Sequence, residues 1–274
     1  MQRIDVIKSV ARNLRDLIVD TVPASLTGTS IDATKLIHPL TGQLKGAEFY
    51  IYQGGGVGQQ RVVTDFLPAN NRLIFEEAFG TIPSINSSFI LLKYFAKDEY
   101  DNALDRLIGN AKLQYLEDKV ATLQIVASQY EYAVPSGFEY IGALKLVPSG
   151  STDYSSDDEV DRIYTLASRY WSIHPNALGT FIIAFDPRKI DLEVIDKEWV
   201  NVIGQVQPFI GATDNATIPA PLEEYIVNGA SMLLSSQRID EAQEWRAKFQ
   251  IFRDTHRTLE QYIYRSRYGK KVGN

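Results

Sequence analysis

Apolar residues follow two different periods along the chain, and the changes of period predict its order of elements. From Ile4 to Asp20 they recur at three- and four-residue intervals, which is the spacing of an amphipathic helix, and Pro23 marks the end of that helix. Between Ile31 and Phe95 the period is two, and turns rich in Gly, Pro and Asn separate short apolar runs. This pattern predicts about five or six strands in a small β-barrel or sandwich.

Helical spacing returns over residues 98–126, where Asp98 can cap the helix and Gly109 weakens it. A second β region follows, with one strand ending at Pro135, a turn through Gly137 and a strand over Tyr140–Val147. Residues 149–159 read as a polar, acidic loop, and residues 200–217 as irregular chain. Three more strands are expected at Ile163–Ile173, Phe181–Phe185 and Leu192–Ile195.

The stretch from Pro219 to Tyr268 predicts two helices in tandem. Apolar residues recur at helical spacing from Leu222 to Leu234, and a longer stripe with several aromatic residues runs from Ile239 to about Tyr264. Each amphipathic helix needs a partner for its apolar face. The predicted fold is therefore α+β, a bundle of about four helices that carries two β-rich insertions. The helices take residues 1–24, 98–127 and 219–268, the insertions residues 31–97 and 130–215, and a basic C-terminal arm residues 265–274.

Composition excludes several classes of chemistry. The chain has 274 residues and no cysteine, so it forms neither disulfides nor thiolate metal sites. Its formal net charge of −6 argues against wrapping nucleic acid on a large basic surface, although a passage through which DNA slides remains compatible with it. No apolar run approaches the ~18 residues that a membrane span needs. We expect a protein made in a reducing cytoplasm, with no membrane segment.

The run Gly54–Gly58 resembles a phosphate-binding loop only superficially. Gln59, Gln60 and Arg61 follow it, whereas a P-loop needs Lys and then Ser or Thr, and a dinucleotide site needs a helix after the glycines. The run is therefore expected to be a hairpin loop.

No other motif supports an active site, a metal site or a cofactor. The three histidines, His38, His174 and His256, lie in different predicted elements without a second ligand at metal spacing. Asp157, Asp158, Glu159 and Asp161 lack the spacing of a calcium loop and are expected to form a solvated acidic segment. We expect no catalysis, the remaining alternative being a hydrolase that uses scattered carboxylates.

The C-terminal tail is the one locally basic stretch, and it interleaves cations with tyrosine. Either it is a solvated helix end, or it is an arm that docks on an acidic partner or touches DNA. The residues of this candidate arm are Arg265, Arg267, Tyr268, Lys270 and Lys271.

Two stretches carry a resemblance to a known family. They are Y-E-Y-A-V-P-S-G-F-E-Y-I-G-A-L-K-L, followed by a later strand pair, and I-P-A-P-L-E-E-Y-I-V-N-G-A-S-M-L-L with E-A-Q-E-W-R-A-K-F. Over about Tyr100 to Tyr264 the arrangement resembles the head-to-tail adaptor, or neck, proteins of tailed bacteriophages. The block G-A-E-F-Y-I-Y-Q-G-G-G-V-G-Q-Q-R-V-V-T-D-F looks like the small β modules of phage virion proteins.

The resemblance implies a structural virion protein in the neck between capsid and tail, made in the host cytoplasm. It would form a ring of about twelve copies, a dodecamer, beneath the portal protein and around the DNA channel. The basic arm would reach the portal. A tail-facing or subunit-facing loop would meet the next neck or tail protein, such as a tail terminator, nozzle or tube. That loop comprises Gly54, Gly55, Gly56, Gln59 and Arg61.

A second hypothesis remains open, in which the chain is a tail-tip or baseplate structural protein. Its β block after Gly46 would then bind a host carbohydrate.

Overall fold

The computed structural model describes residues 1–23, 25–34, 36, 41–147, 164–176, 180–193, 198–263 and 270–271. Its fold is mixed α+β, and in this part of the chain it has four α-helices and antiparallel sheets. The chain divides into two compact units. The first unit contains residues 1–111 and 210–263, and the second contains residues 112–209 and 264–274.

The first helix is shorter than its sequence pattern predicts. Helix α1 spans Arg3–Asn13, and the predicted continuation to Asp20 is wrong because Leu17–Thr21 forms strand β1. Arg15 interrupts the helix with a φ of 59°. Strand β1 pairs with β7, Ser88–Leu92, along its whole length. Since the apolar run suits either period, the pairing with a distant strand decides its structure.

The β block of the first unit is a seven-stranded antiparallel sheet in the order β1-β7-β4-β5-β6-β3-β2. Five strands, β3 to β7, fall where about five or six were expected, and β1 and β2 precede the expected start. The 3₁₀ turn Pro68–Asn70 separates β5 from β6. The remaining bounds are β2 Ser25–Thr27, β3 Ser30–Asp32, β4 Glu48–Gln53, β5 Gln60–Leu67 and β6 Arg72–Phe75.

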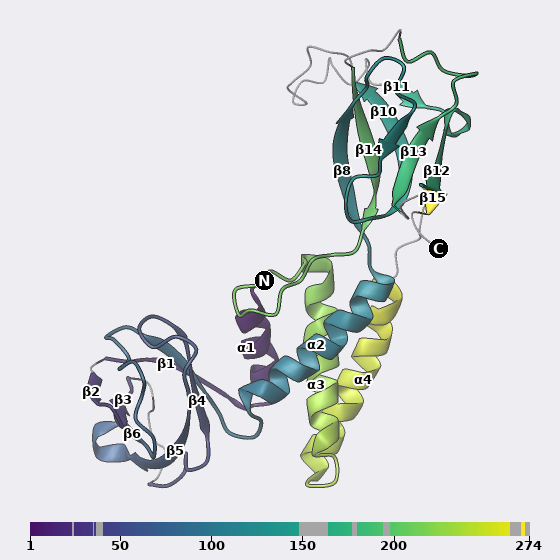
Figure 1. The fold of residues 1–274 in the computed structure, drawn as a ribbon. Helices are drawn as coiled ribbons and strands as arrows, with labels where there is room; N and C mark the ends of the chain where they lie inside the picture. The colour runs from purple at the N-terminus through teal and green to yellow at the C-terminus, as the bar shows by residue number, and fades with distance from the viewer. Residues whose placement is uncertain are drawn as a thin grey trace. The chain divides into compact units, whose positions relative to one another are not determined.

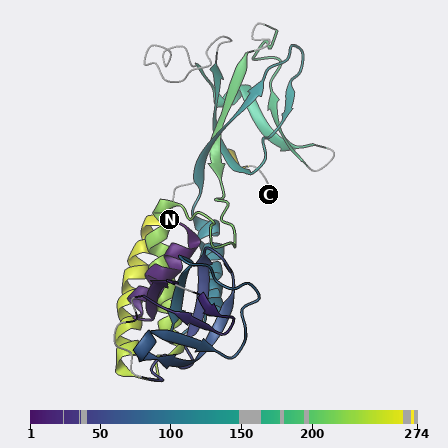
Figure 2. The same cartoon turned by 90° about the vertical axis from the view of Figure 1, so that its left-hand side faces the viewer.

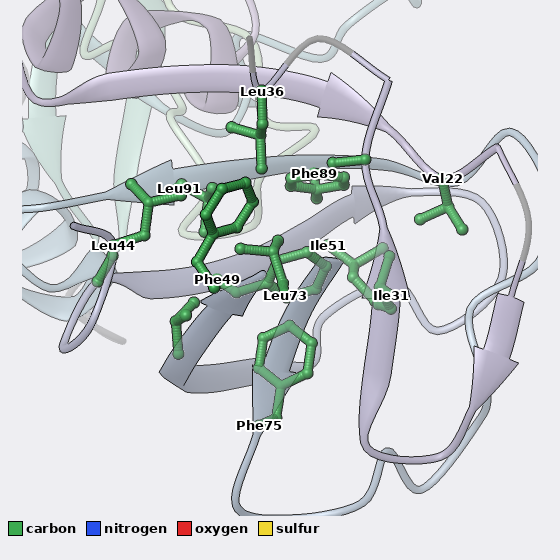
Figure 3. Close-up of a cluster of buried hydrophobic side chains, with 14 of the residues drawn as sticks. Val22, Ile31, Leu36, Leu44, Phe49, Ile51, Leu73, Phe75, Phe89 and Leu91 are labelled. Carbon is green, nitrogen blue, oxygen red and sulfur yellow. The ribbon is translucent and has the colours of Figure 1, made fainter. Parts of the chain in front are cut away.

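One apolar core holds this sheet together, and its side chains point toward one another (Figure 3). Within this core the Phe49 ring contacts other aromatic rings. Its centroid lies 4.5 Å from the centroid of Phe89 and 5.0 Å from that of Phe75. Full burial of an aromatic or aliphatic side chain contributes about 1.5–3 kcal/mol. The core therefore makes this sheet a stable scaffold for the loops at its ends.

The other helices are α2, Lys97–Gln114, α3, Ala220–Gln237, and α4, Gln243–Ile263. The tandem helices expected after Pro219 are thereby confirmed. The helix expected over residues 98–126 ends early, because Glu117–Gln124 forms strand β8. This strand pairs along its length with Trp199–Val206, strand β14, in a stretch that was wrongly expected to be irregular.

Close contacts join the helices of the first unit. Helices α3 and α4 lie side by side (Figures 1 and 2). A Cβ added at Gly229 of α3 would lie 2.7 Å from the ring of His256 in α4 and 2.8 Å from Leu107 in α2, so a glycine permits this approach. Arg3 of α1, only 1% exposed, pairs with Asp101 at 3.0 Å and Asp105 at 2.7 Å in α2. The guanidinium of Arg3 is buried although its carboxylate partners are partly exposed, so losing both partners would leave a buried charge unpaired.

The second unit packs a five-stranded sheet and a three-stranded sheet around one core. The turn at Gly137, with a φ of 87°, and the strands expected near Tyr140 and Phe181 are confirmed. The strand expected over Ile163–Ile173 is instead divided by the 3₁₀ turn Ser168–Tyr170. Of the strand expected over 192–195, the first two residues form a turn, and the other two lie outside the described residues. The remaining bounds are β9 Glu131–Ala133, β10 Phe138–Val147, β11 Tyr164–Leu166, β12 Trp171–Pro175, β13 Phe181–Phe185 and β15 Lys270–Lys271.

Candidate interaction surface

Two loops at one end of the seven-stranded sheet form a surface that we call the loop platform, residues 54–59 and 79–87. The first loop joins β4 to β5, which pair antiparallel, so the predicted hairpin at Gly54–Gly58 is confirmed. Three of its glycines have left-handed φ values: Gly54 at 92°, Gly56 at 81° and Gly58 at 86°. Glycine adopts this conformation at the lowest steric cost.

Side chains hydrogen-bond the two loops to each other. Gln59 donates from Nε2 to the Thr81 carbonyl at 2.7 Å and accepts the Thr81 N–H at Oε1, 3.2 Å away. The Gly55 N–H donates to Ser84 Oγ at 3.2 Å, and Ser87 Oγ donates to the Gly55 carbonyl at 3.0 Å. Because both loops are fixed to each other, their surface is largely formed before any partner arrives.

The glycines also allow the loops to approach closely. A Cβ at Gly54 would lie 2.8 Å from the Ser87 Cα, and one at Gly55 would lie 3.0 Å from the Ser84 backbone nitrogen. Glycine is therefore needed in this run both for the turn conformations and for the close packing of the two loops.

The platform exposes three aliphatic side chains. Val57 is 59% exposed, Ile82 55% and Ile85 63%. The sequence pattern pointed instead to Gln59, which is bonded to Thr81 of the other loop, and to Arg61, which is bonded to the Ala78 carbonyl. The sequence does contain a signal for these side chains, because β-branched residues are unusual inside turns rich in Gly, Pro and Ser. Exposed aliphatic side chains on two loops that are bonded to each other make this surface a candidate protein contact site.

Arg61 lies beside the loop platform and contacts the start of its second loop. Its guanidinium donates to the Ala78 carbonyl, at 2.6 Å from Nη2, and its Cζ lies 5.3 Å from the centroid of the Phe79 ring. A pocket of about 230 Å³ opens next to it, and burial raises the pKa of Glu48 in its wall. The lining residues are Glu48, Gln60, Arg61, Val62, Glu76 and Glu77.

The predicted C-terminal arm is only partly described. Arg265, Arg267 and Tyr268 lie outside the described residues. Lys270 and Lys271 form β15, which pairs with Ile141 and Tyr140 of β10 in the same chain. The tail thus contributes a strand to the sheet of the second unit.

Of the three histidines, two lie in the described part of the chain, and they belong to different units. His174 lies exposed in β12, His256 is buried in α4 against the Tyr225 ring at 4.4 Å between centroids, and His38 falls outside the described part. The acidic residues 157–161 also fall outside it. Among the residues described, no three His, Cys, Asp or Glu side chains gather so that they could hold a metal ion. Within the same residues, no helix has the length and apolar character of a membrane span.

No protein-family model matches this chain, and no curated protein matches it.

Proposed function

We propose that this chain is a structural protein of a tailed-phage virion, a head-to-tail connector that joins the portal to the tail and lines part of the DNA channel. The observation that carries the proposal is the loop platform, a preformed, hydrogen-bonded surface with three exposed aliphatic side chains. Such a surface suits a contact that forms once and persists, as between neighbouring virion proteins.

The order of elements supports the same proposal. One β block lies between α1 and α2, and the other lies between α2 and α3. In this proposal the four helices form a bundle that is the body of the ring, and the two β modules are insertions that reach its neighbours. A ring needs two different surfaces on each copy, because its contacts are head-to-tail.

Charge is compatible with a passage for DNA. The formal net charge of −6 disfavours tight binding to phosphates, since such binding depends on clustered Lys and Arg. DNA would then pass without sequence-specific contact. In this proposal the loop platform meets the next neck or tail protein, and Arg265, Arg267 and Tyr268 reach the portal.

The test is electron microscopy of the purified full chain, alone and with the portal protein from the same genome. We expect closed rings, or a density that caps the portal at its tail-side end. In cells infected by phage lacking the gene, filled heads and free tails should accumulate separately. Normal tail joining without this chain, or no binding to the portal, would refute the proposal.

A further inference from the structure

Helix α4 has two buried side chains among those that the structure describes, one in each half of the helix. Trp245 is 7% exposed and His256 is 8% exposed, whereas the other described side chains of α4 are partly buried or exposed. The helix packs along α3 (Figure 1). The second half of α4 therefore depends on an ionisable residue for its buried contact.

The first half of α4 is held by contacts in which His256 takes no part. The Trp245 ring lies edge-on to the rings of Tyr94 and Phe95, with centroids 5.5 Å and 5.6 Å apart. Lys248 donates from Nζ to the Leu14 carbonyl at 2.9 Å. These contacts fix the start of the helix independently of its end.

In the second half, the His256 ring lies on Tyr225 and Gly229 of α3. The two rings stack with 4.4 Å between centroids and 30° between planes. Nδ1 of His256 lies 3.2 Å from the Tyr225 carbonyl oxygen, and because a carbonyl only accepts, Nδ1 carries the hydrogen. Gly229, one turn further along α3, leaves room for the ring, and Leu107 of α2 lies at the same glycine. The described contacts of the ring are thus apolar or aromatic, apart from one carbonyl oxygen.

A second proton would enter this ring at Nε2. Among the described residues, Nε2 has no hydrogen-bond partner. The charged ring would therefore carry a buried charge and an N–H donor that its surroundings do not satisfy. Burial lowers the pKa of His256 for this reason. Since a ring that reaches water takes the proton more readily, acid favours the separated state of the two helices.

The ionisable groups near the ring do not compensate for its burial. Tyr225 stays neutral, because burial raises the pKa of its phenol. Glu260, one turn along α4, favours the protonated ring, but it is exposed and the structure shows no ion pair between them. Of the cations nearby in α4, Arg253 is paired with Asp254 and Arg257 is exposed. Desolvation of the ring therefore decides the balance.

We propose that protonation of His256 releases the second half of α4, residues 253–263, from α3, while the first half stays docked through Trp245. The fold thus contains an acid-sensitive switch at the contact between its last two helices. This inference follows from the helix contacts alone and does not depend on the proposed connector.

Hydrogen exchange of the full chain, read by mass spectrometry at about pH 7.5 and about pH 5.5, tests the switch. The readout is the protection factor, which removes the intrinsic effect of pH on exchange. Protection of residues 253–263 should fall several-fold at the lower pH. The fall should not exceed about ten-fold, because one proton changes the equilibrium at most about ten-fold over the one pH unit below 6.5. Protection of residues 243–252 should stay unchanged.

Three variants assign the effect to His256. His256→Gln should abolish the dependence on pH, because glutamine can donate to the Tyr225 carbonyl but takes no proton. His256→Phe also takes no proton and keeps an aromatic ring on Tyr225, so it repeats the test if glutamine weakens the helix contact. The matched control is His174→Gln, which alters an exposed histidine of β12 in the other unit and should keep the full dependence.

Each outcome decides for or against the switch. A loss confined to residues 253–263, absent from both His256 variants and kept in His174→Gln, supports it. Equal protection of these residues at both pH values would overturn it. The same loss in both His256 variants would assign the effect to another group, and a loss over the whole of α4 would contradict the division between its halves.

Discussion

Replacing Ile85 by serine is the sharpest test of the loop platform. Ile85 is 63% exposed, so the substitution removes apolar surface that contributes to binding more than to folding. Ile251 of α4 is a matched control, because it is the same residue type with the same 63% exposure on a different surface. Any effect specific to Ile85 therefore reports on its place in the platform.

The expected magnitude follows from the exposed fraction. Full burial of an isoleucine side chain contributes about 1.5–3 kcal/mol, so covering the remaining exposed part contributes about 1–2 kcal/mol. Each 1.4 kcal/mol is a factor of ten in affinity. Ile85→Ser should thus weaken binding to the next neck or tail protein about five- to thirty-fold.

The assay is joining of tails, in vitro, to filled heads that lack this chain, as the purified chain is titrated. Ile85→Ser should raise the concentration for half-maximal joining, and Ile251→Ser should leave it unchanged. Thermal unfolding of both variants should match the parent within about 0.5 kcal/mol, as for other exposed sites. Equal losses for the two variants, or none for Ile85→Ser, would refute a role for the platform.

Three other predictions concern stability, each measured by denaturant unfolding. Asp16→Asn should lower the free energy of unfolding by about 2–4 kcal/mol. The buried carboxylate accepts hydrogen bonds from three backbone N–H groups and from the Tyr100 hydroxyl, whereas an amide accepts at one oxygen alone. A loss below about 1 kcal/mol would contradict this account. Gly54→Ala should lower the free energy of unfolding by about 1–3 kcal/mol, because position 54 has a positive φ and a Cβ there would clash with Ser87. An unchanged denaturation midpoint would show that the two loops shift to accommodate the methyl group. Burial lowers the pKa of His256 below its usual 6.5, so just below pH 6.5 the unfolded chain binds more protons than the folded chain. The free energy of unfolding should therefore fall as pH falls through that range. His256→Gln should remove this contribution to the pH dependence.

The parts of the fold that the sequence predicted are those with a local cause. The helices after Pro219 follow from apolar spacing within each segment, and the hairpin at Gly54–Gly58 follows from the conformations that glycine allows. Each signal lies within a few residues of the structure it specifies. No distant partner was needed to find them.

Strands β1 and β8 were mistaken for helix because their patterns are compatible with both periods. Leu17–Thr21 becomes a strand through β7, some 70 residues away, and Glu117–Gln124 becomes one through β14. Strand pairing is a long-range contact, and the energy that it supplies is absent from the local pattern. Sequence periodicity therefore misplaced both helix ends.

The candidate surfaces show the same division. The sequence by itself determined the glycine run and the basic tail. Only the tertiary structure decided that the loop of Val57 is bonded to the loop of Ile82 and Ile85, and that Lys270 and Lys271 pair with β10. The physical reason is that a surface joins residues that are far apart in the chain, and their proximity is set by the cores beneath them.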